Sequence, residues 1–483
     1  MEITWVFIVF GTWLIALAFL IKELNDPKRK LPPGPRPWPI IGNLNLLGSL
    51  PHESLHHLSQ KYGDLMLLKF GSKPVLIASS PEMAKEILKT HDAIFASRPA
   101  LAAGKYTSYN YWRQARKIYL TEVFNPRRLD SLEYIRVEER QILISRLYPL
   151  SGKPILLKDH LPRFTLRNIS RFVMSDKYYS DHHDQSVASI VTLEALQLIL
   201  DEWFLLGGVI NIGDWVSWLS WFDLQGYVKR MKDMVDVLLH LADDPNLEIK
   251  LTTDRLMALM HDLIAGATDT SAATIEWAFQ ELLRRPNTIE KAQEELDRTI
   301  GKERWVEEEE FSQLPYIDAI IKETFRLHPL CALLPPHYSI EDCNIAGYDI
   351  PKGTTAYVNA WSLGRNSKYW DRPEEFIPER FIENNIDMKG QNFSLLPFGF
   401  GRRRCPGYSL GIKVVRTTMA NLLHGFNWKL AGDMNPKNIS MEEIYGLTTH
   451  PQKPISMIME PRLPLHLYRI IILCSVHINL VLC

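Results

Sequence analysis

Residues 397–407 read Pro-Phe-Gly-Phe-Gly-Arg-Arg-Arg-Cys-Pro-Gly, a loop rich in glycine and arginine that carries a single cysteine. The residues that follow, 408–423, have the pattern of a helix, so Cys405 comes shortly before a helix N-terminus. The positive end of a helix dipole favours a thiolate over a thiol, and glycines allow backbone amides to approach the sulfur closely. Two interpretations follow from these residues alone: an activated cysteine, or a buried cysteine in a turn between two elements.

Five positions of the loop favour the first interpretation. Phe398, Gly401, Arg403, Cys405 and Gly407 match the pattern Phe-x-x-Gly-x-Arg-x-Cys-x-Gly, and the loop therefore resembles the cysteine loop of cytochromes P450. The resemblance implies that Cys405 is the thiolate ligand of the iron in haem b (iron protoporphyrin IX) and that Phe398, Arg403 and Gly407 help to bind the haem. It also implies the mainly α P450 fold with a small β portion. Electron donation from an axial thiolate promotes O–O cleavage.

The longest helical pattern of the chain, over 253–285, supplies a second motif. Small residues around Gly266 leave a bare groove, and the Thr270 hydroxyl can bond the carbonyl of Gly266, four residues earlier, and bend the helix. That structural role alone would explain Thr270. Beside the cysteine loop, however, the stretch resembles the oxygen-binding groove of P450s, with Ala267 where glycine is usual. The resemblance implies that Thr270 orients protons toward bound dioxygen and that Asp269 is the relay carboxylate.

Glu323 and Arg326 lie three residues apart near the end of a predicted helix. Alone, such a pair is a common surface ion pair that contributes ~0.3 kcal/mol. Together with Arg380, which stands in a Pro-Glu-Arg-Phe segment, they resemble the Glu-x-x-Arg motif of P450s and its arginine partner. The resemblance implies a buried structural lock behind the haem rather than a catalytic group.

The same resemblance implies a set of residues that neutralises the haem propionates: Trp112, Arg116, His337 and Arg403. Many relatives have arginine where His337 stands, so its contact is expected to be weaker and to depend on pH, and a lone histidine is more often an exposed loop residue. The sequence contains no Gly-x-Gly-x-x-Gly or P-loop motif for binding a reductant, so electrons are expected from a partner. The family implies NADPH–cytochrome P450 reductase, docked on the cysteine side, where Arg402 and Arg404 either assist or form a solvated face.

Composition bounds the class of protein. The 483 residues are 46% hydrophobic and 23% charged with a net charge of −1, which suits a large core and gives no basic excess for nucleic acid. The five cysteines are too few and too irregularly spaced for a disulfide framework, and no Cys-x-x-Cys pair indicates zinc. A reducing compartment fits best.

The N-terminal stretch predicts a membrane anchor. Residues 3–21 carry no charge, and basic residues within 22–30 follow them. A cleaved signal peptide is the competing interpretation, but it lacks a basic start and a clear cleavage site. We therefore expect an anchor over 1–22, a basic and proline-rich hinge over 23–44, and a single-pass protein of the endoplasmic reticulum membrane with its body in the cytosol.

The rest of the chain predicts one haem domain over 45–468, followed by an atypical apolar tail over 469–483, too short to span a membrane. We expect a hairpin over 65–79 and a helix over 81–89, with Ser80 as its N-cap. Further helices are expected over the ranges 54–62, 112–120, 130–150, 159–205, 253–285, 287–301 and 315–327.

Phrases such as Ala-Ser-Arg-Pro at 96–99 and Leu-Leu-Pro-Phe-Gly at 395–399 resemble plant microsomal A-type P450s, particularly flavonoid 3′-hydroxylases and homoterpene synthases. The expected reaction is insertion of one oxygen atom into a lipophilic terpenoid, phenylpropanoid or flavonoid. Two alternatives stay open: a haem-thiolate enzyme that cleaves or rearranges C–C bonds, and a catalytically impaired haem-binding isoform. The candidate pocket residues are small or apolar: Leu101, Ala102, Leu263, Ala267, Leu333, Leu334 and Leu447.

Two departures from these relatives bear on activity. A segment is missing directly after Asn110, in the loop that caps the pocket, and another directly after Lys232, where relatives continue a long roof helix. Neither gap touches the cysteine loop. We therefore expect haem binding to be retained and substrate binding to be impaired.

Overall fold

The computed structural model describes residues 13, 29–107, 116–174, 193–232, 254–384, 386–388, 390–432 and 434–468. Its α-helices are α2 (Pro51–Tyr62), α3 (Pro81–Lys85), α4 (Asp92–Phe95), α5 (Ala102–Thr107), α7 (Pro126–Ser131), α8 (Glu133–Leu147), α9 (Leu161–Met174), α10 (Leu193–Gly208), α11 (Ile212–Trp215), α13 (Asp254–Arg284), α14 (Pro286–Thr299), α15 (Pro315–Leu327), α16 (Ala360–Arg365), α17 (Arg380–Glu383) and α18 (Tyr408–Gly425).

The strands are short: β1 (Leu65–Phe70), β2 (Lys73–Ala78), β3 (Pro154–Leu156), β4 (His337–Tyr338), β5 (Cys343–Ile345), β6 (Tyr348–Ile350), β7 (Thr355–Val358), β8 (Phe426–Leu430), β9 (Glu443–Ile444), β10 (His450–Pro451) and β11 (Ser456–Pro461). The mainly α fold with a small β portion is therefore confirmed.

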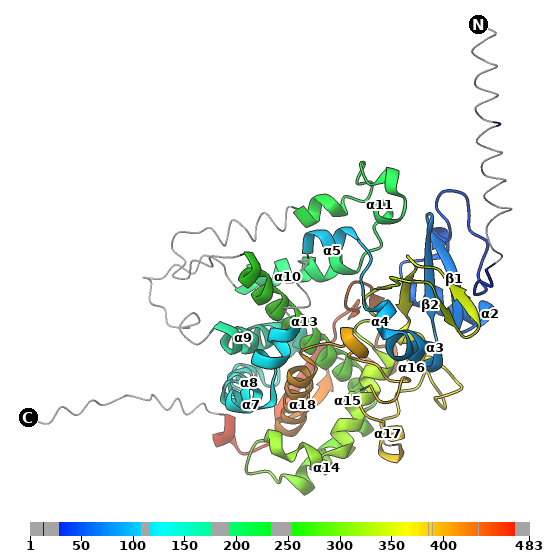
Figure 1. Cartoon of the computed structure of the whole chain (residues 1–483). Coiled ribbons are helices and arrows are strands. Elements are labelled where there is room, and N and C mark those ends of the chain that lie inside the picture. Colours follow the sequence, from blue (N-terminus) through cyan, green and yellow to red (C-terminus); the bar gives the residue numbers. More distant parts are fainter. Residues whose placement is uncertain are drawn as a thin grey trace, which may run out of the picture.

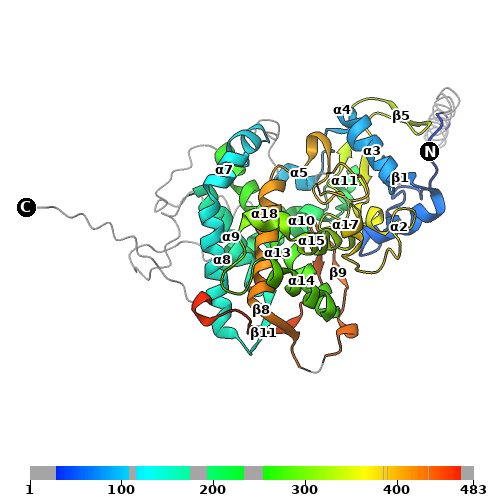
Figure 2. The ribbon, with the colours of Figure 1, turned by 90° about the horizontal axis from the view of Figure 1, so that it is seen from below.

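Helix α13 runs through the middle of the molecule, and α9, α15 and α18 pack against it (Figures 1 and 2). Along its C-terminal half nearly every side chain is buried, including Ile275, Trp277 and Phe279. A helix whose side chains are buried on nearly all faces lies within a core, where other elements cover each face. The 31-residue α13 is thus the central helix of the fold, and it carries the candidate functional residues Asp269 and Thr270.

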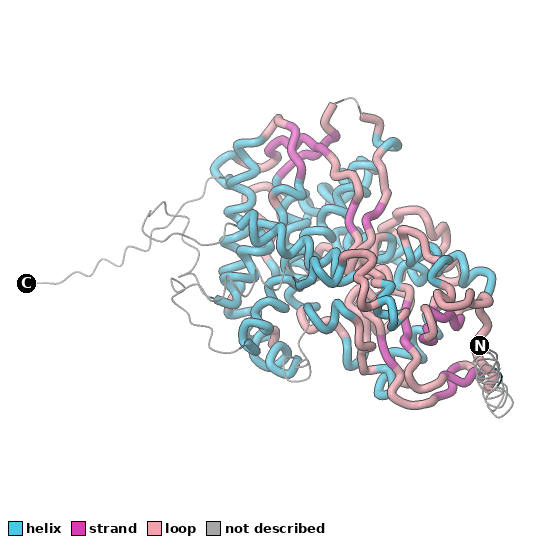
Figure 3. Tube along the Cα trace, turned by 90° about the horizontal axis from the view of Figure 1, so that it is seen from above, coloured by secondary structure: helices cyan, strands magenta, loops and turns pink. Residues whose placement is uncertain are grey.

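The largest sheet joins distant parts of the chain in the order β1-β2-β7-β4. β1 and β2 form the predicted hairpin, with Gly71 at φ +57 in the turn, and β2 pairs in parallel with β7 through Val75 and Thr355. Figure 3 shows helices gathered on one side of the molecule and many of the loops on the side nearer this sheet. β4 carries His337 to the sheet edge.

Most expected elements are found close to their predicted bounds. Ser80 caps α3, its Oγ accepting from the amide of Met83 at 3.4 Å, and α13, α14 and α15 match the ranges expected for them. α2 begins at Pro51 rather than at 54, because proline fits the first turn of a helix, where its missing N–H costs nothing. Of the helix expected over 112–120, only residues from 116 onward are described.

The expected anchor over 1–22, apart from Trp13, and the tail over 469–483 lie outside the described residues. Among the residues that are described, no helix has the length and apolar character needed to cross a bilayer. The predicted transmembrane helix therefore stays a prediction.

Candidate active site

The loop that carries Cys405 is closed by its own backbone. The amide of Cys405 donates to the carbonyl of Phe398 at 2.9 Å, and Gly399 and Gly401 have φ of +63 and +72, which favour glycine. A Cβ on Gly401 would lie 2.5 Å from both Oδ1 of Asp92 and the carbonyl oxygen of Leu88. The loop can therefore lie this close to residues 88–92 only with glycine at 401.

The sulfur lies where burial and positive charge oppose each other. Withdrawal from water raises the pKa of the Cys405 thiol, although a hydrogen bond from the Gly407 amide and the charges of Arg116 and Arg404 act to lower the pKa. α18 begins at Tyr408, as predicted, so Cys405 does stand shortly before a helix N-terminus, but in the protein alone burial outweighs the local positive groups. A metal ligated by the sulfur would supply the missing stabilisation, since a coordinated thiol is deprotonated.

Guanidinium groups surround the loop. Nη1 of Arg116 donates to the carbonyl of Arg404, and Nε of Arg403 donates to the carbonyl of Ala96 at 2.6 Å. Burial lowers the pKa of Arg116 and of Arg403, and the charge of Arg116 lowers that of Arg403 further. The structure therefore brings these two predicted propionate partners together, whereas Trp112 lies outside the described residues.

Arg98 belongs to this cluster, although the sequence analysis does not single it out. Its Nη1 donates to the carbonyls of Pro335 and Pro336, each at 2.6 Å, and in the described part of the chain no carboxylate pairs with it. Burial, followed by the charge of Arg403, lowers the pKa of Arg98 to about 9. Such an uncompensated, partly desolvated cation points to an anionic ligand that is not part of the chain.

His337 lies close enough to Arg98 for the guanidinium charge to affect the protonation of its ring. It is buried, its Nδ1 donates to the carbonyl of Phe95 at 2.9 Å, and burial together with the charge of Arg98 lowers its pKa to about 3. The ring is neutral near pH 7, so His337 can offer a hydrogen bond but contributes no charge. Most of the positive charge at this position comes from Arg98.

The groove predicted in α13 is open at its glycine. The Thr270 hydroxyl donates to the carbonyl of Gly266 at 2.8 Å, as the spacing predicts, and in the described part of the chain no heavy atom outside the neighbouring helix backbone lies within 4 Å of the position that a Cβ on Gly266 would occupy. Ala267 packs partly buried against the main core, and Leu263 lies within it. The helix therefore presents bare backbone beside the Thr270 hydroxyl.

Asp269 has partners that the sequence analysis missed. Its Oδ2 accepts from the hydroxyl of Thr448 at 2.8 Å and lies 3.1 Å from Nε2 of His450. These partners follow β9, about 180 residues further along the chain, so no local sequence pattern could have indicated them.

The Glu323 lock forms as a buried unit. Nε of Arg326 donates to Oε2 of Glu323 at 2.7 Å, and Nε of Arg380 donates to Oε1 at 3.0 Å. Arg326 also donates to the carbonyls of Pro373 and Glu375, which ties α15 to the segment before α17. A carboxylate with two guanidinium partners and no exposed surface is a structural element, because an unpaired buried charge would be costly.

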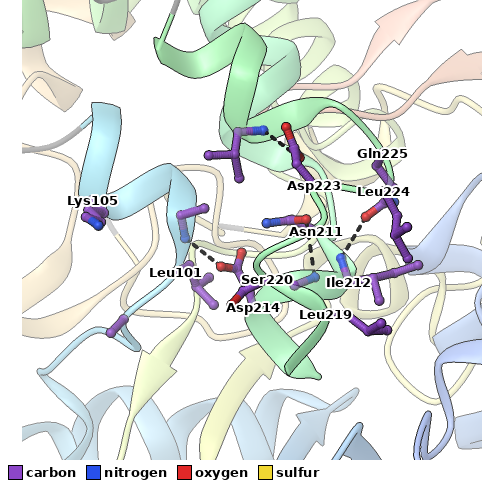
Figure 4. A pocket seen from close by; sticks show the side chains of 14 residues that line it. Leu101, Lys105, Asn211, Ile212, Asp214, Leu219, Ser220, Asp223, Leu224 and Gln225 are labelled. Atoms are coloured by element: carbon purple, nitrogen blue, oxygen red, sulfur yellow. Dashed lines mark hydrogen bonds between the residues drawn. The ribbon is translucent and has the colours of Figure 1, made fainter. Parts of the chain in front are cut away.

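Two cavities adjoin this part of the chain. Leu101, Leu333 and Leu447 line one of about 50 Å³ between α10, β7 and the residues after β9. Leu101 and Ala102 also line a second, of about 310 Å³, between residues 100–105 and residues 211–228 (Figure 4), where the Ala102 amide donates to Oδ1 of Asp214 at 2.8 Å. Leu334 instead packs in the core beside the sheet, so the predicted pocket residues are brought together only in part.

These features fit haem. A half-buried cysteine offers the metal ligand, the backbone at Gly266 is bare, and Arg98 and Arg116 stand without carboxylate partners in the described part of the chain. Nε and Nη2 of Arg404 are also buried without a hydrogen-bond partner among the described residues, although the guanidinium stacks on the Tyr408 ring at 3.7 Å. An iron porphyrin with two propionates meets each of these needs.

Comparison with known proteins agrees with this site. The sequence profile of the family described as "Cytochrome P450" matches residues 32–218 and 219–458. Trimethyltridecatetraene synthase of Zea mays is 40% identical over 524 aligned residues, which cover 94% of each chain. Dimethylnonatriene synthase of Zea mays is 40% identical, covering 91% of this chain and 92% of the relative, and flavonoid 3′-monooxygenase of Petunia hybrida is 37% identical, covering 91% and 93%.

The chain belongs to the cytochrome P450 family, and similar proteins in that family are monooxygenases. Its family implies a haem cofactor. The alignment with the first relative spans 524 positions, more than the 483 residues of this chain, so some positions of that relative have no counterpart here. This agrees with missing segments, although the junctions after Asn110 and Lys232 adjoin residues that the structure does not describe.

Proposed function

We propose that the chain is a membrane-anchored haem-thiolate monooxygenase that inserts one atom of dioxygen into a lipophilic plant metabolite, a terpenoid or a phenylpropanoid such as a flavonoid. The observation that carries the proposal is the Cys405 loop, with a free cysteine beside Arg116 and with Arg98 near Arg403 of the same loop, since Arg98 and Arg116 need an anionic partner. Haem, when bound, supplies the iron that binds and activates dioxygen.

The chain's own residues then have separate tasks. Cys405 would hold the iron, and Arg98, Arg116 and Arg403 would hold the propionates, with His337 adding a neutral hydrogen bond. Thr270 keeps a hydroxyl beside the bare backbone of Gly266, and Asp269, the next residue toward the N-terminus, is the carboxylate that passes protons to it. Apolar side chains such as Leu101, Leu333 and Leu447 bind an apolar substrate and exclude water.

We further propose that the electrons come from NADPH through cytochrome P450 reductase, and that the protein lies in the endoplasmic reticulum membrane with its 45–468 domain in the cytosol. Exposed aromatic side chains support a membrane-facing surface: Trp221 is 90% and Phe222 67% exposed, and both lie next to the larger cavity. Amphipathic aromatic rings are favoured at the interface between lipid and water.

A second candidate is cleavage of a C–C bond in an acyclic terpene alcohol. It follows from the resemblance to homoterpene synthases, and two Zea mays relatives named trimethyltridecatetraene synthase and dimethylnonatriene synthase are 40% identical over more than nine tenths of this chain. The third candidate, a haem-binding isoform without turnover, is favoured by the segments that the chain lacks.

Two measurements test the proposal. The reduced, purified full-length chain should give the red-shifted thiolate–CO absorption band, and the absence of any such band would reject haem-thiolate binding. A panel of flavonoids and acyclic terpene alcohols, incubated with reductase and with or without NADPH, should then yield an oxygenated product. Shortened carbon skeletons would favour the second candidate, and a normal CO band without NADPH consumption would favour the third.

A further inference from the structure

His450 lies at the start of β10. Its ring nitrogen Nε2 lies 3.1 Å from Oδ2 of Asp269 and 3.0 Å from the hydroxyl oxygen of Thr448. Thr448 donates its own proton to Asp269, so its oxygen can only accept from the ring. Both neighbours of Nε2 are therefore acceptors. The hydrogen-bond pattern consequently places a proton on Nε2, directed at Asp269.

The surroundings of His450 are acidic. Burial acts to lower the pKa of His450, but the charge and hydrogen bond of Asp269, with smaller contributions from Glu276 and Asp201, outweigh burial and raise the pKa. β10, α10 and the 3-10 turn Leu157–Asp159 all pack against α13 around this position. The charged groups facing it from these elements are Asp269 and Glu276 on α13, Asp201 on α10, and Lys158 and Asp159 on the turn.

Glu276 continues the same face of α13, because seven residues, or two turns, separate it from Asp269. Burial, opposed by the charges of His450 and Lys158, raises the pKa of Glu276 to about 7. A carboxyl group with that pKa gains and loses protons readily near neutral pH. Asp201, Lys158 and Asp159 are exposed, His450 is about one third exposed, and Asp269 is mostly buried. The cluster therefore runs from the surface to Asp269.

We propose that His450, whose ring is partly exposed, delivers protons from solvent to Asp269, with Glu276 and Asp201 as acidic surroundings of the ring. In the step itself the Nε2–H bond breaks and an O–H bond forms on Oδ2 of Asp269, which leaves a neutral ring and a neutral carboxyl group. The ring regains its proton from water on its exposed side. His450 is thus a positioning and proton-supplying residue behind Asp269, and the inference rests on the proposed monooxygenase function.

The alternative is that the His450–Asp269 pair merely ties β10 to α13. Three substitutions of the full-length chain separate the two roles. His450→Gln keeps a neutral donor, His450→Lys keeps a positive charge that does not titrate near neutral pH, and His57→Gln, at an exposed position on α2, is the matched control. A purely structural pair should tolerate lysine, whereas a proton donor should not.

The first readout does not depend on turnover. Histidine-selective NMR of the carbon monoxide-bound protein should show a ring signal whose titration midpoint lies above the ordinary histidine value of about 6.5. That signal should be absent from the spectrum of His450→Gln. Asp269→Asn should lower that midpoint. A midpoint that Asp269→Asn does not move would overturn the pairing on which the inference depends.

The second readout is the rate of NADPH oxidation with saturating reductase, without added organic substrate, between pH 6 and 9. In the wild type the rate should fall as pH rises through the midpoint of His450, since the donor is then lost. His450→Gln and His450→Lys should both lower the rate about tenfold at pH 6.5 and give a flat profile, and His57→Gln should match the wild type.

Wild-type rate and slope in either His450 variant would overturn the relay while leaving the monooxygenase proposal intact. A wild type with a CO band but no NADPH oxidation would reject both.

Discussion

Nε2 of His328 lies 2.8 Å from Oε1 of Glu281, and both side chains are buried between α13 and the end of α15. The His328 ring stacks on Trp277 with 4.1 Å between the ring centroids and an angle of 6°. Although burial acts in the opposite direction, Glu281 and Glu443 raise the pKa of His328. The pair therefore joins two helices through a charge that depends on pH.

The stability contributed by His328 should decrease as pH rises. A histidine with a raised folded-state pKa stabilises fully below its unfolded pKa of about 6.5 and loses that contribution as pH rises through the folded-state value. His328→Gln should thus lower the free energy of unfolding by about 3 kcal/mol at pH 6 and by less at pH 9. Urea unfolding followed by tryptophan fluorescence measures this, with the exposed His57→Gln as control. If His328→Gln lowered the free energy of unfolding by the same amount at both pH values, the ion pair between His328 and Glu281 would be contradicted.

The Glu323 lock predicts a large and specific loss of stability. Arg326→Ala leaves the carboxylate of Glu323 buried with one guanidinium partner fewer, so the free energy of unfolding should fall by about 3–5 kcal/mol. Lys429→Ala removes one partner of an exposed cross-strand pair with Glu460 and should cost no more than about 1 kcal/mol. Equal losses in the two variants, by urea unfolding, would show that the lock is no stronger than a surface pair.

Gly208 permits a close approach between α10 and the segment after β9. A Cβ there would lie 1.9 Å from the carbonyl carbon of Gly446 and 2.0 Å from the amide nitrogen of Leu447, so Gly208→Ala must push the two backbones apart. We expect a loss of about 1–3 kcal/mol in urea unfolding and changed difference spectra with the terpenoid and flavonoid panel, because Leu447 lines the smaller cavity.

Gly104→Ala is the matched control for this change, since among the described residues no heavy atom outside the neighbouring helix backbone lies within 4 Å of its Cβ position. It should leave stability within about 1 kcal/mol of the wild type. Unaltered stability and difference spectra in Gly208→Ala would mean that the backbones of α10 and Gly446 are not in close contact.

Arg98 and His337 should differ in how strongly they retain haem. Arg98→Leu removes a partly buried charge and should speed haem loss about tenfold or more, as expected for a charge-assisted hydrogen bond. His337→Gln replaces a ring that is neutral near pH 7, because its pKa is about 3, and should have a smaller effect with no dependence on pH between 6 and 8. Transfer of haem to an excess of a scavenging protein measures both rates. If haem left His337→Gln faster than it left Arg98→Leu, His337 rather than Arg98 would be the stronger haem contact.

The sequence was a good guide wherever function depends on neighbouring residues. The Cys405 loop, the hydrogen bond from Thr270 to Gly266 and the cap at Ser80 all involve groups a few residues apart, whose geometry a local pattern fixes. Glu323 and Arg326 also lie on one helix, and the Pro-Glu-Arg-Phe segment was enough to indicate Arg380.

It was a poor guide where charge and burial depend on packing. His337 was expected to share in neutralising charge, yet its place on a buried strand keeps it neutral and leaves that task to Arg98. The positive end of the α18 dipole was expected to favour the thiolate of Cys405, and burial opposes this effect by raising the pKa of the thiol. Desolvation depends on every neighbouring element, so no stretch of sequence contains it.

The sequence by itself therefore determined the family, the cysteine that would hold iron and the helix that lies along the groove, because short motifs with fixed spacing specify them. Only the tertiary structure decided which distant groups meet. It brought His450 and Thr448 to Asp269, Arg98 to the strand that carries His337, and the backbone of α10 onto Gly446. At Asp269 the contact pairs a mostly buried carboxylate, whereas the other two follow from how distant elements pack, which no local pattern contains.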